Sequence, residues 1–130
     1  MIPDYQHAAE KAREVFLKYR TNDPLEVIRK QKNTLVLSFL ELSDTIGVNR
    51  DALLMVCGED NQDAVTTVHN DNGNIRYLIA FNQRLQEYAI KTALARELGH
   101  IALQHDGSRL EEVRNEEALC FAYHFICMKE

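Results

Sequence analysis

A dense turn signal in the middle of the chain constrains the fold more than any other feature. Residues 70–74 read Asn-Asp-Asn-Gly-Asn, and the flanking segments 64–69 and 75–81 are rich in β-branched and aromatic side chains. Asn-Gly between two such segments is a strong short-range signal for a β-hairpin, because both residues tolerate the positive φ angles that a tight hairpin turn needs. The sequence therefore predicts an antiparallel pair of strands.

Helical patterns flank this hairpin on both sides. Before it, apolar spacing predicts a helix over residues 4–19, and Asp23-Pro24 predicts the start of another, since Asp caps helices and Pro suits the first helical position. A branched apolar segment at 34–37 predicts a strand. After the hairpin, helices are expected over about 85–105 and 110–128. Helices, then a small antiparallel sheet, then two helices indicate an α+β fold.

Composition limits the classes of protein that the chain can belong to. Its 130 residues predict one domain, 1–130, and no apolar run is long enough to span a bilayer. Because no basic segment followed by an apolar stretch opens the chain, we expect a cytoplasmic protein. The net charge of -5 disfavours a nucleic-acid surface. A disulfide framework is not indicated, because the chain has only three cysteines, which is an odd number: Cys57, Cys120 and Cys127.

The segment Arg96-Glu97-Leu98-Gly99-His100 carries the clearest chemical signal. It matches the zinc-protease helix motif H-E-x-x-H, in which two histidines one helical turn apart bind zinc and the glutamate acts as general base. Arg96 stands at the first histidine position and has no lone pair to donate. Glu97 is therefore the candidate catalytic base and His100 a candidate metal ligand, with one ligand missing.

A plainer interpretation of this helix is a solvated face that carries charges at i,i+4 spacing. Gly99 is unfavourable inside a helix and needs a reason, which close approach of another backbone or of a third ligand would supply. On a continuous helix His105 lies about 140° round from His100, so we expect it not to reach the same metal.

The following helix places a carboxylate in an apolar stripe. Glu117 shares its face with Val113, Cys120, His124 and Met128, and an unpaired carboxylate there would be costly. A metal, a hydrogen bond or an arginine would stabilise it. A glutamate one helix after H-E-x-x-H is a known third zinc ligand, whereas an ion pair, for instance with Arg96, is the structural alternative.

Cys120 and His124 could instead contribute to a displaced soft-metal site, since they lie on one helical face and Cys127 follows three residues later. Packing for the cysteines and a hydrogen-bonded or lining role for His124 is the simpler interpretation.

Two blocks of the sequence together resemble the ImmA/IrrE family of metallopeptidases. Residues 92–105, T-A-L-A-R-E-L-G-H-I-A-L-Q-H, are similar to that family's T-L-A-H-E-L-G-H helix with a trailing histidine. Residues 116–125, E-E-A-L-C-F-A-Y-H-F, are similar to its E-A-N-x-F-A-x-x-L helix. A weaker likeness to a C-G-S-x-D-A-x-T connector lies at 57–66, and the strand end at 79–82 also fits. The resemblance covers roughly residues 34–128.

The resemblance implies a minimal zincin-like α+β domain in which His100 and Glu117 bind zinc and Glu97 is the general base. Members of the family are often encoded on mobile elements, and some cleave or inactivate a helix-turn-helix repressor. Arg96 replaces the family's first zinc histidine, and a cation there repels a metal. We therefore expect a degenerate metallopeptidase-like regulatory protein with weakened zinc binding, whose partner is a regulatory protein such as a helix-turn-helix repressor.

Three functions remain open at this point. The chain could be an active metal-dependent endopeptidase with a rearranged site. It could be a pseudopeptidase in which a pair between Arg96 and Glu117, or between Arg96 and Glu97, replaces the ion. It could also be a DNA-binding helix-turn-helix module over 39–56, although the second helix of that segment offers only Asn49 and Arg50 as polar reading residues.

Overall fold

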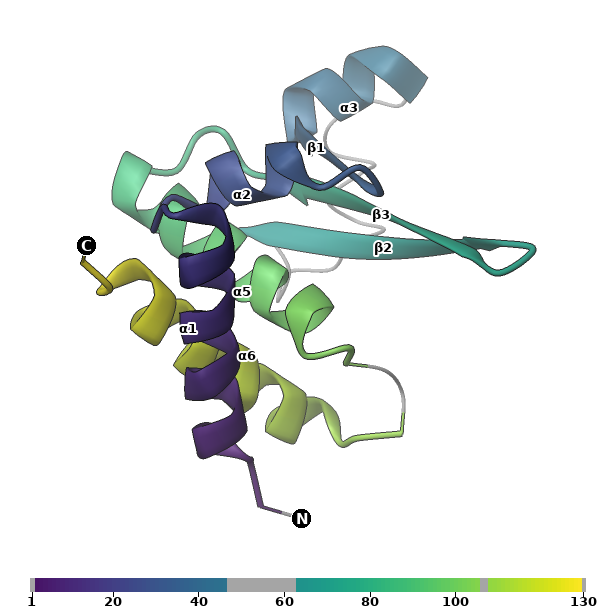
Figure 1. Ribbon diagram of the computed structural model, residues 1–130. Helices are drawn as coiled ribbons and strands as arrows, with labels where there is room; N and C mark the ends of the chain where they lie inside the picture. The colour runs from purple at the N-terminus through teal and green to yellow at the C-terminus, as the bar shows by residue number, and fades with distance from the viewer. Residues whose placement is uncertain (1, 47–62, 106–107, 130) are drawn as a thin grey trace. The chain divides into compact units, whose positions relative to one another are not determined.

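The structure is a computed structural model that describes residues 2–46, 63–105 and 108–129 (Figure 1). Five helices and three strands lie within these ranges. In chain order they are α1 (Tyr5–Tyr19), α2 (Pro24–Lys30), β1 (Thr34–Ser38), α3 (Phe39–Ile46), β2 (Ala64–Asp71), β3 (Asn74–Phe81), α5 (Glu87–Ala102) and α6 (Glu111–Ile126). The α+β prediction is confirmed, and its zincin-like refinement stays a prediction.

The chain forms two compact units. The helical unit consists of Met1–Val27 and Ala95–Glu130, and the sheet unit consists of Ile28–Leu94. The boundary falls inside α5, so its second half, which carries the motif residues, belongs to the helical unit. The expectation of a single domain stays a prediction. Over the described ranges, no helix has the length and apolar character of a membrane-spanning segment.

The sheet has the strand order β1-β3-β2. β2 and β3 form the expected antiparallel hairpin, with register from Ala64↔Phe81 to Asp71↔Asn74. β1 lies parallel to β3, from Thr34↔Tyr77 to Ser38↔Phe81, so the sheet is mixed and the prediction of an antiparallel sheet is wrong for this strand. Strand direction depends on how a long connection returns the chain, which the local residue pattern of β1 does not encode.

The hairpin turn uses the residues that the sequence singled out. Asn72 and Gly73 have φ angles of 52° and 91°, and the Gly73 N–H donates to Asn70 Oδ1 at 3.0 Å. Two consecutive positive φ angles match the right-handed twist of the strands that they join. The Asn-Gly signal therefore fixes both the turn and the register of β2 against β3.

The start of α3 is closed by a reciprocal pair of hydrogen bonds. The Glu41 N–H donates to Ser38 Oγ and the Ser38 N–H donates to Glu41 Oε1, each at 3.0 Å, which is a capping box. The bond from the Ser38 N–H is the main cause that lowers the pKa of Glu41. Phe39 and Leu42 of this helix then pack with Ala80 of β3 in an apolar core. The second helix of the expected DNA-binding segment lies outside the described residues.

In the helical unit, α1 and α6 lie side by side and run in the same direction (Figure 1). Contacts near their starts join Asp4 and Tyr5 to residues 116–120, whereas the Asn22 amide, after α1, donates to the carbonyls of Ile126 and Met128 at 2.9 and 3.0 Å. The face of α1 that is buried consists of small or aromatic residues four apart: Ala8, Ala12 and Phe16. Small residues allow the close approach of a neighbouring helix.

Gly99 allows the side chain of Phe121 to approach α5. A Cβ atom at this position would lie 3.0–3.1 Å from three atoms of Phe121, which is closer than carbon atoms normally pack. The expected reason for Gly99, close approach of another backbone or of a third ligand, is wrong, because its neighbour is an aromatic side chain of α6.

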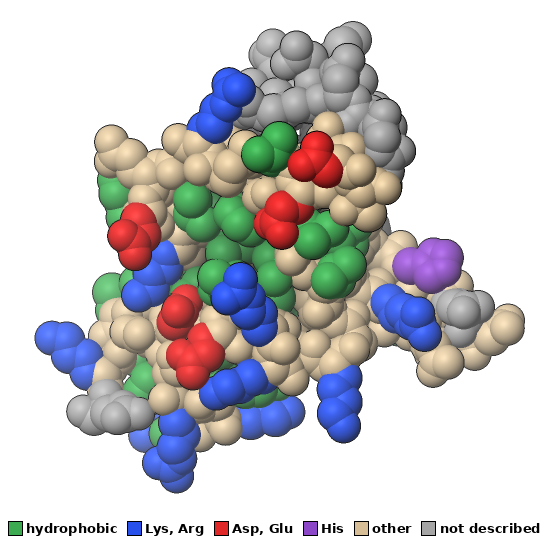
Figure 2. Space-filling view, turned by 90° about the horizontal axis from the view of Figure 1, so that it is seen from above, with side chains coloured by type: hydrophobic (Ala, Val, Ile, Leu, Met, Phe, Trp, Pro, Cys, Tyr) green, Lys and Arg blue, Asp and Glu red, His purple; other side chains and the backbone are tan. Residues whose placement is uncertain are grey.

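The face of the molecule in Figure 2 shows acidic and basic side chains interspersed around a group of hydrophobic ones. Basic side chains are at least as prominent as acidic ones on this face, so it does not mirror the net charge of -5 of the whole sequence.

Candidate functional site

The helical unit contains all of the candidate site residues. Glu97 and Glu117 are buried, with 7% and 4% of their surfaces exposed. His100, on the same half of α5 as Glu97, is partly buried. On α6, His124 is exposed, whereas the Cys120 thiol donates to the carbonyl of Tyr5 at 3.6 Å. Hydrogen bonds through His105 connect His100 to Glu117, whereas His124 faces solvent.

Glu117 is the centre of a buried hydrogen-bond network. Its Oε1 atom accepts from His105 Nε2 and from Arg109 Nε, both at 3.0 Å. Its Oε2 atom accepts from Arg109 Nη2 at 2.6 Å and from the backbone N–H of Asp4 at 2.7 Å. A carboxylate has about four lone-pair positions, so all of its acceptor capacity is used.

Burial by itself would raise the pKa of Glu117. The N–H of Asp4, the guanidinium of Arg109 and the ring of His105 outweigh that effect, and the pKa lies below its ordinary value. Glu117 is consequently an ionised carboxylate at neutral pH, and its charge is matched by Arg109 in a two-bond fork.

The sequence interpretation of Glu117 as part of an ion pair with an arginine has the right chemistry, but the partner is Arg109 rather than Arg96. Arg109 lies in the segment just before the N-cap residue Leu110 of α6, eight positions before Glu117. Helical spacing could not identify it, because the side chain comes from the segment that leads into the helix. The only available signal was an arginine just upstream of a helix with a buried acid.

His105 reaches His100 because α5 ends before it. Gln104 adopts a left-handed φ of 54°, the Gln104 N–H bonds to the Ile101 carbonyl and the His105 N–H bonds to the His100 carbonyl. These bonds form a Schellman motif, which reverses the chain at a helix end. The two Nδ1 atoms of His100 and His105 are 2.8 Å apart. The prediction that His105 points away from His100 is wrong, since it assumed a continuous helix.

The network fixes the proton positions on both rings. Because the Glu117 carboxylate accepts, His105 Nε2 carries a hydrogen, and a neutral His105 then accepts at Nδ1 from His100 Nδ1–H. Burial is the main cause that lowers the pKa of His100 to about 4, with contributions from His105, Arg96 and Arg114. Burial also lowers the pKa of His105, against the opposing effect of Glu117. His100 is therefore neutral at pH 7, with a lone pair on Nε2.

These residues, in this arrangement, do not fit a zinc ion. With Zn–N bonds of about 2.0–2.1 Å, two nitrogen ligands of a tetrahedral site lie about 3.4 Å apart, whereas the two Nδ1 atoms lie at hydrogen-bond distance. Glu117 has no free acceptor, so among His100, His105 and Glu117 only Nε2 of His100 is uncommitted. Within the described ranges, no group of three or more His, Cys, Asp or Glu residues is placed to hold a metal.

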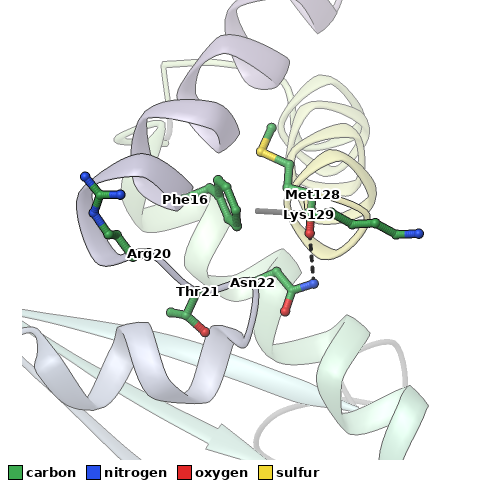
Figure 3. Close-up of a pocket in the computed structure, with 6 residues that line it drawn as sticks. All are labelled: Phe16, Arg20, Thr21, Asn22, Met128 and Lys129. Atoms are coloured by element: carbon green, nitrogen blue, oxygen red, sulfur yellow. Dashed lines mark hydrogen bonds between the residues drawn. The ribbon is translucent and has the colours of Figure 1, made fainter.

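A separate hollow of about 370 Å³ lies elsewhere in the helical unit (Figure 3). Its lining comes from the end of α1 and from the segments that follow α1 and α6: Phe16, Arg20, Thr21, Asn22, Met128 and Lys129. In Figure 3 the Phe16 ring points into the space between these elements, while the charged ends of Arg20 and Lys129 point away in opposite directions. None of the candidate site residues lines this hollow.

Comparisons of the chain with models of protein families, with curated proteins and with solved structures find no match in any of the three. The ImmA/IrrE resemblance therefore rests on the two helix blocks of the sequence and stays a prediction.

Proposed function

We propose that this chain is a regulatory protein of the ImmA/IrrE type that has replaced zinc-dependent hydrolysis with partner binding. The proposed partner is a regulatory protein such as a helix-turn-helix repressor, which is bound and left intact. One observation supports the loss of hydrolysis above the others. Glu117, the residue that the resemblance makes a zinc ligand, is fully occupied by Arg109, His105 and the backbone of Asp4.

An arginine fork can serve the structural purpose of a metal at this position. It supplies positive charge to a buried carboxylate and orients it through two parallel bonds, as a ligated ion would. Arg96 adds a second cation close to His100 and contributes to its lowered pKa. Both arginines oppose a divalent cation electrostatically, so the proposal accounts for Arg96 and Arg109 together.

Metal content tests the first half of the proposal. Elemental mass spectrometry of the natural chain, of Arg96→His and of Arg96→His with Arg109→Gln should show zinc close to one per chain only in the double variant. That variant restores the missing histidine and frees an oxygen of Glu117. Near-stoichiometric zinc in the natural chain, lost in Glu117→Ala, would make an active metallopeptidase the better explanation.

The second half is tested with purified helix-turn-helix repressors from the same genome. Size-exclusion chromatography should show a stable complex with one of them, and intact-mass analysis should show that repressor uncut after prolonged incubation. Glu97→Gln removes the candidate base and should leave complex formation unchanged. Cleavage of the repressor that disappears in Glu97→Gln would contradict the proposal.

A further inference from the structure

The outer edge of β1 is open in the part of the chain that the structure describes. β1 is an end strand in the order β1-β3-β2, and β3 is its described strand partner. Its sequence, Thr-Leu-Val-Leu-Ser, contains neither a charged residue nor a proline. Natural proteins usually protect an edge strand with such residues, because unpaired N–H and C=O groups are a template for another strand. An edge without this protection is expected to be paired.

The register with β3 shows which backbone groups face the open edge. The Tyr77 N–H donates to the Asn33 carbonyl at 2.8 Å. Bonds to a parallel neighbour come from every second residue, so β1 uses Asn33 and Leu35 for β3. The backbone groups of Thr34 and Val36 therefore point to the open edge, where the described residues offer them no partner.

Leu35 adds an exposed apolar side chain to this edge. It is 57% exposed, whereas Leu37, on the same face of the strand, packs against the core formed by Phe39, Leu42 and Ala80. A single exposed leucine is ordinary on a protein surface. This one, however, lies between the two residues with outward backbone groups, so hydrogen bonds and apolar contact are offered at the same place.

We propose that β1 of a second copy of this chain pairs with this edge, antiparallel, about a two-fold axis at Leu35. Thr34 of one copy then lies opposite Val36 of the other, and each such pair exchanges both of its backbone hydrogen bonds. The two Leu35 side chains lie directly opposite each other in a non-hydrogen-bonded pair, where cross-strand contacts are closest. This register does not need the Ser38 N–H, which is already bonded to Glu41 Oε1 at 3.0 Å.

The charges at the two ends of β1 favour a second copy in this orientation. Lys32 is exposed just before the strand, and Glu41 is exposed just after it and held against the backbone of Ser38. The register places Lys32 of one copy opposite Ser38 of the other, so an opposite charge lies near it at both ends. Complementary charges at the rim of an interface favour one orientation, whereas a parallel, in-register pair would bring the two lysines together. The inference concerns the sheet unit and does not depend on the proposed function.

Sedimentation velocity of the full chain over a range of concentrations tests the proposal. The sedimentation coefficient should rise with concentration from that of a monomer to that of a dimer. Leu35→Lys places two like charges directly opposite each other and should stay monomeric, while circular dichroism shows an unchanged fold because Leu35 is exposed. The matched control is Val68→Lys on β2, the other edge strand, where the side chain is 61% exposed, and it should keep the dimer. A natural chain that is monomeric at every concentration, or a dimer that survives Leu35→Lys, overturns the proposal.

Cross-linking tests the register independently. The Cα atoms of a non-hydrogen-bonded antiparallel pair lie about 4.5 Å apart, within the range that a disulfide spans. Leu35→Cys should therefore give a covalent dimer under mild oxidation, and peptide mapping should show a link between the two substituted positions rather than through the exposed Cys127. Val68→Cys is the control and should give little of the corresponding link. Absence of the link in Leu35→Cys, or an equal yield in Val68→Cys, overturns the proposed pairing.

Discussion

The polar groups that mark the two units differ in how far apart their partners lie along the chain. In the sheet unit the partners that close the hairpin turn and cap α3 are close in sequence: Ser38 and Glu41, and Asn70 and Gly73, are each three residues apart. In the helical unit the backbone N–H of Asp4 bonds to Glu117 across 113 positions. Local pairs are encoded by short motifs, whereas the network around Glu117 exists only once two distant segments have packed.

The difference also concerns what each unit buries. The sheet unit packs Phe39, Leu42 and Ala80 in an apolar core, which is stabilised by removing apolar surface from water. The helical unit buries an ionised carboxylate beside one buried and one partly buried histidine side chain, and removing one partner of such a group is costly. The helical unit should therefore be the more sensitive of the two to single polar substitutions and to pH.

The largest expected effect is the loss of the buried carboxylate. Glu117→Leu leaves Arg109, His105 and the Asp4 N–H without their acceptor and should lower the free energy of unfolding by about 3–5 kcal/mol. Urea denaturation followed by circular dichroism measures this change. The double variant Glu117→Leu with Arg109→Leu removes both charges and should recover a large part of the loss. Equal losses in the single and double variants would show that the ion pair is not what the helical unit depends on.

The matched change in the sheet unit is Glu41→Gln. Glutamine can take the place of glutamate in a capping box, and Glu41 is exposed, so the urea midpoint should change little. A loss as large as that of Glu117→Leu would remove the contrast between the two units.

The second effect is a loss of stability in mild acid that originates in the helical unit. His100 titrates near its ordinary value of 6.5 when unfolded and at about 4 when folded, so the unfolded chain binds the extra proton first. Stability should fall as the pH drops from 6.5 to 4, by on the order of 3 kcal/mol in total. The lowered pKa of Glu117 acts in a different window, below its ordinary 4.5, where protonation of the carboxylate removes its contribution.

Urea midpoints measured between pH 7 and pH 4.5 follow His100 together with His105, whose pKa burial also lowers, and a variant of His100 separates the two. The variant His100→Asn retains a donor at the position of Nδ1 but does not titrate, so its midpoint should vary much less over this range. An unchanged pH dependence in this variant would mean that another group is responsible.

The third effect is the loss of stability when alanine replaces Gly99 or Gly73, which are glycines for different reasons. Gly99→Ala places a methyl group against Phe121, and overpacking of this kind costs about 1–3 kcal/mol, partly offset by the higher helix propensity of alanine. Gly73→Ala meets no atom within 4 Å, but its φ of 91° is strained for alanine, by about 1–2 kcal/mol. Combining Gly99→Ala with Phe121→Leu should relieve the first loss. Lack of any relief would indicate that Phe121 is not the obstacle.

The sequence predicts the features that depend on neighbouring residues and misses those that depend on distant segments. The hairpin register and the start of α2 were predicted correctly, because Asn72-Gly73 and Asp23-Pro24 act through their immediate neighbours. The direction of β1 and the pairing of Arg109 with Glu117 were not, because both depend on how distant segments pack.

His105 is an instructive intermediate case. Its distance from His100 along the chain is short, and the angle expected on an ideal helix was correct, yet the helix ends at Ala102. The stop signal was hidden, since glutamine rather than glycine occupies the left-handed position that closes the Schellman motif. Sequence reasoning therefore failed at a residue that adopts an unfavourable backbone conformation.

That conformation leads to the smallest effect, and the only one expected to be stabilising. Glycine adopts a positive φ without the steric cost that Gln104 bears at 54°, so Gln104→Gly should raise the free energy of unfolding by about 0.5–1 kcal/mol. The exposed Gln104 side chain makes no hydrogen bond within the described residues that would be lost. Gln104→Val should do the opposite, because a β-branched side chain is the least compatible with this conformation. If both substitutions destabilise the protein equally, the turn that brings His105 to His100 is not limited by backbone conformation, and the network around Glu117 must itself impose the turn.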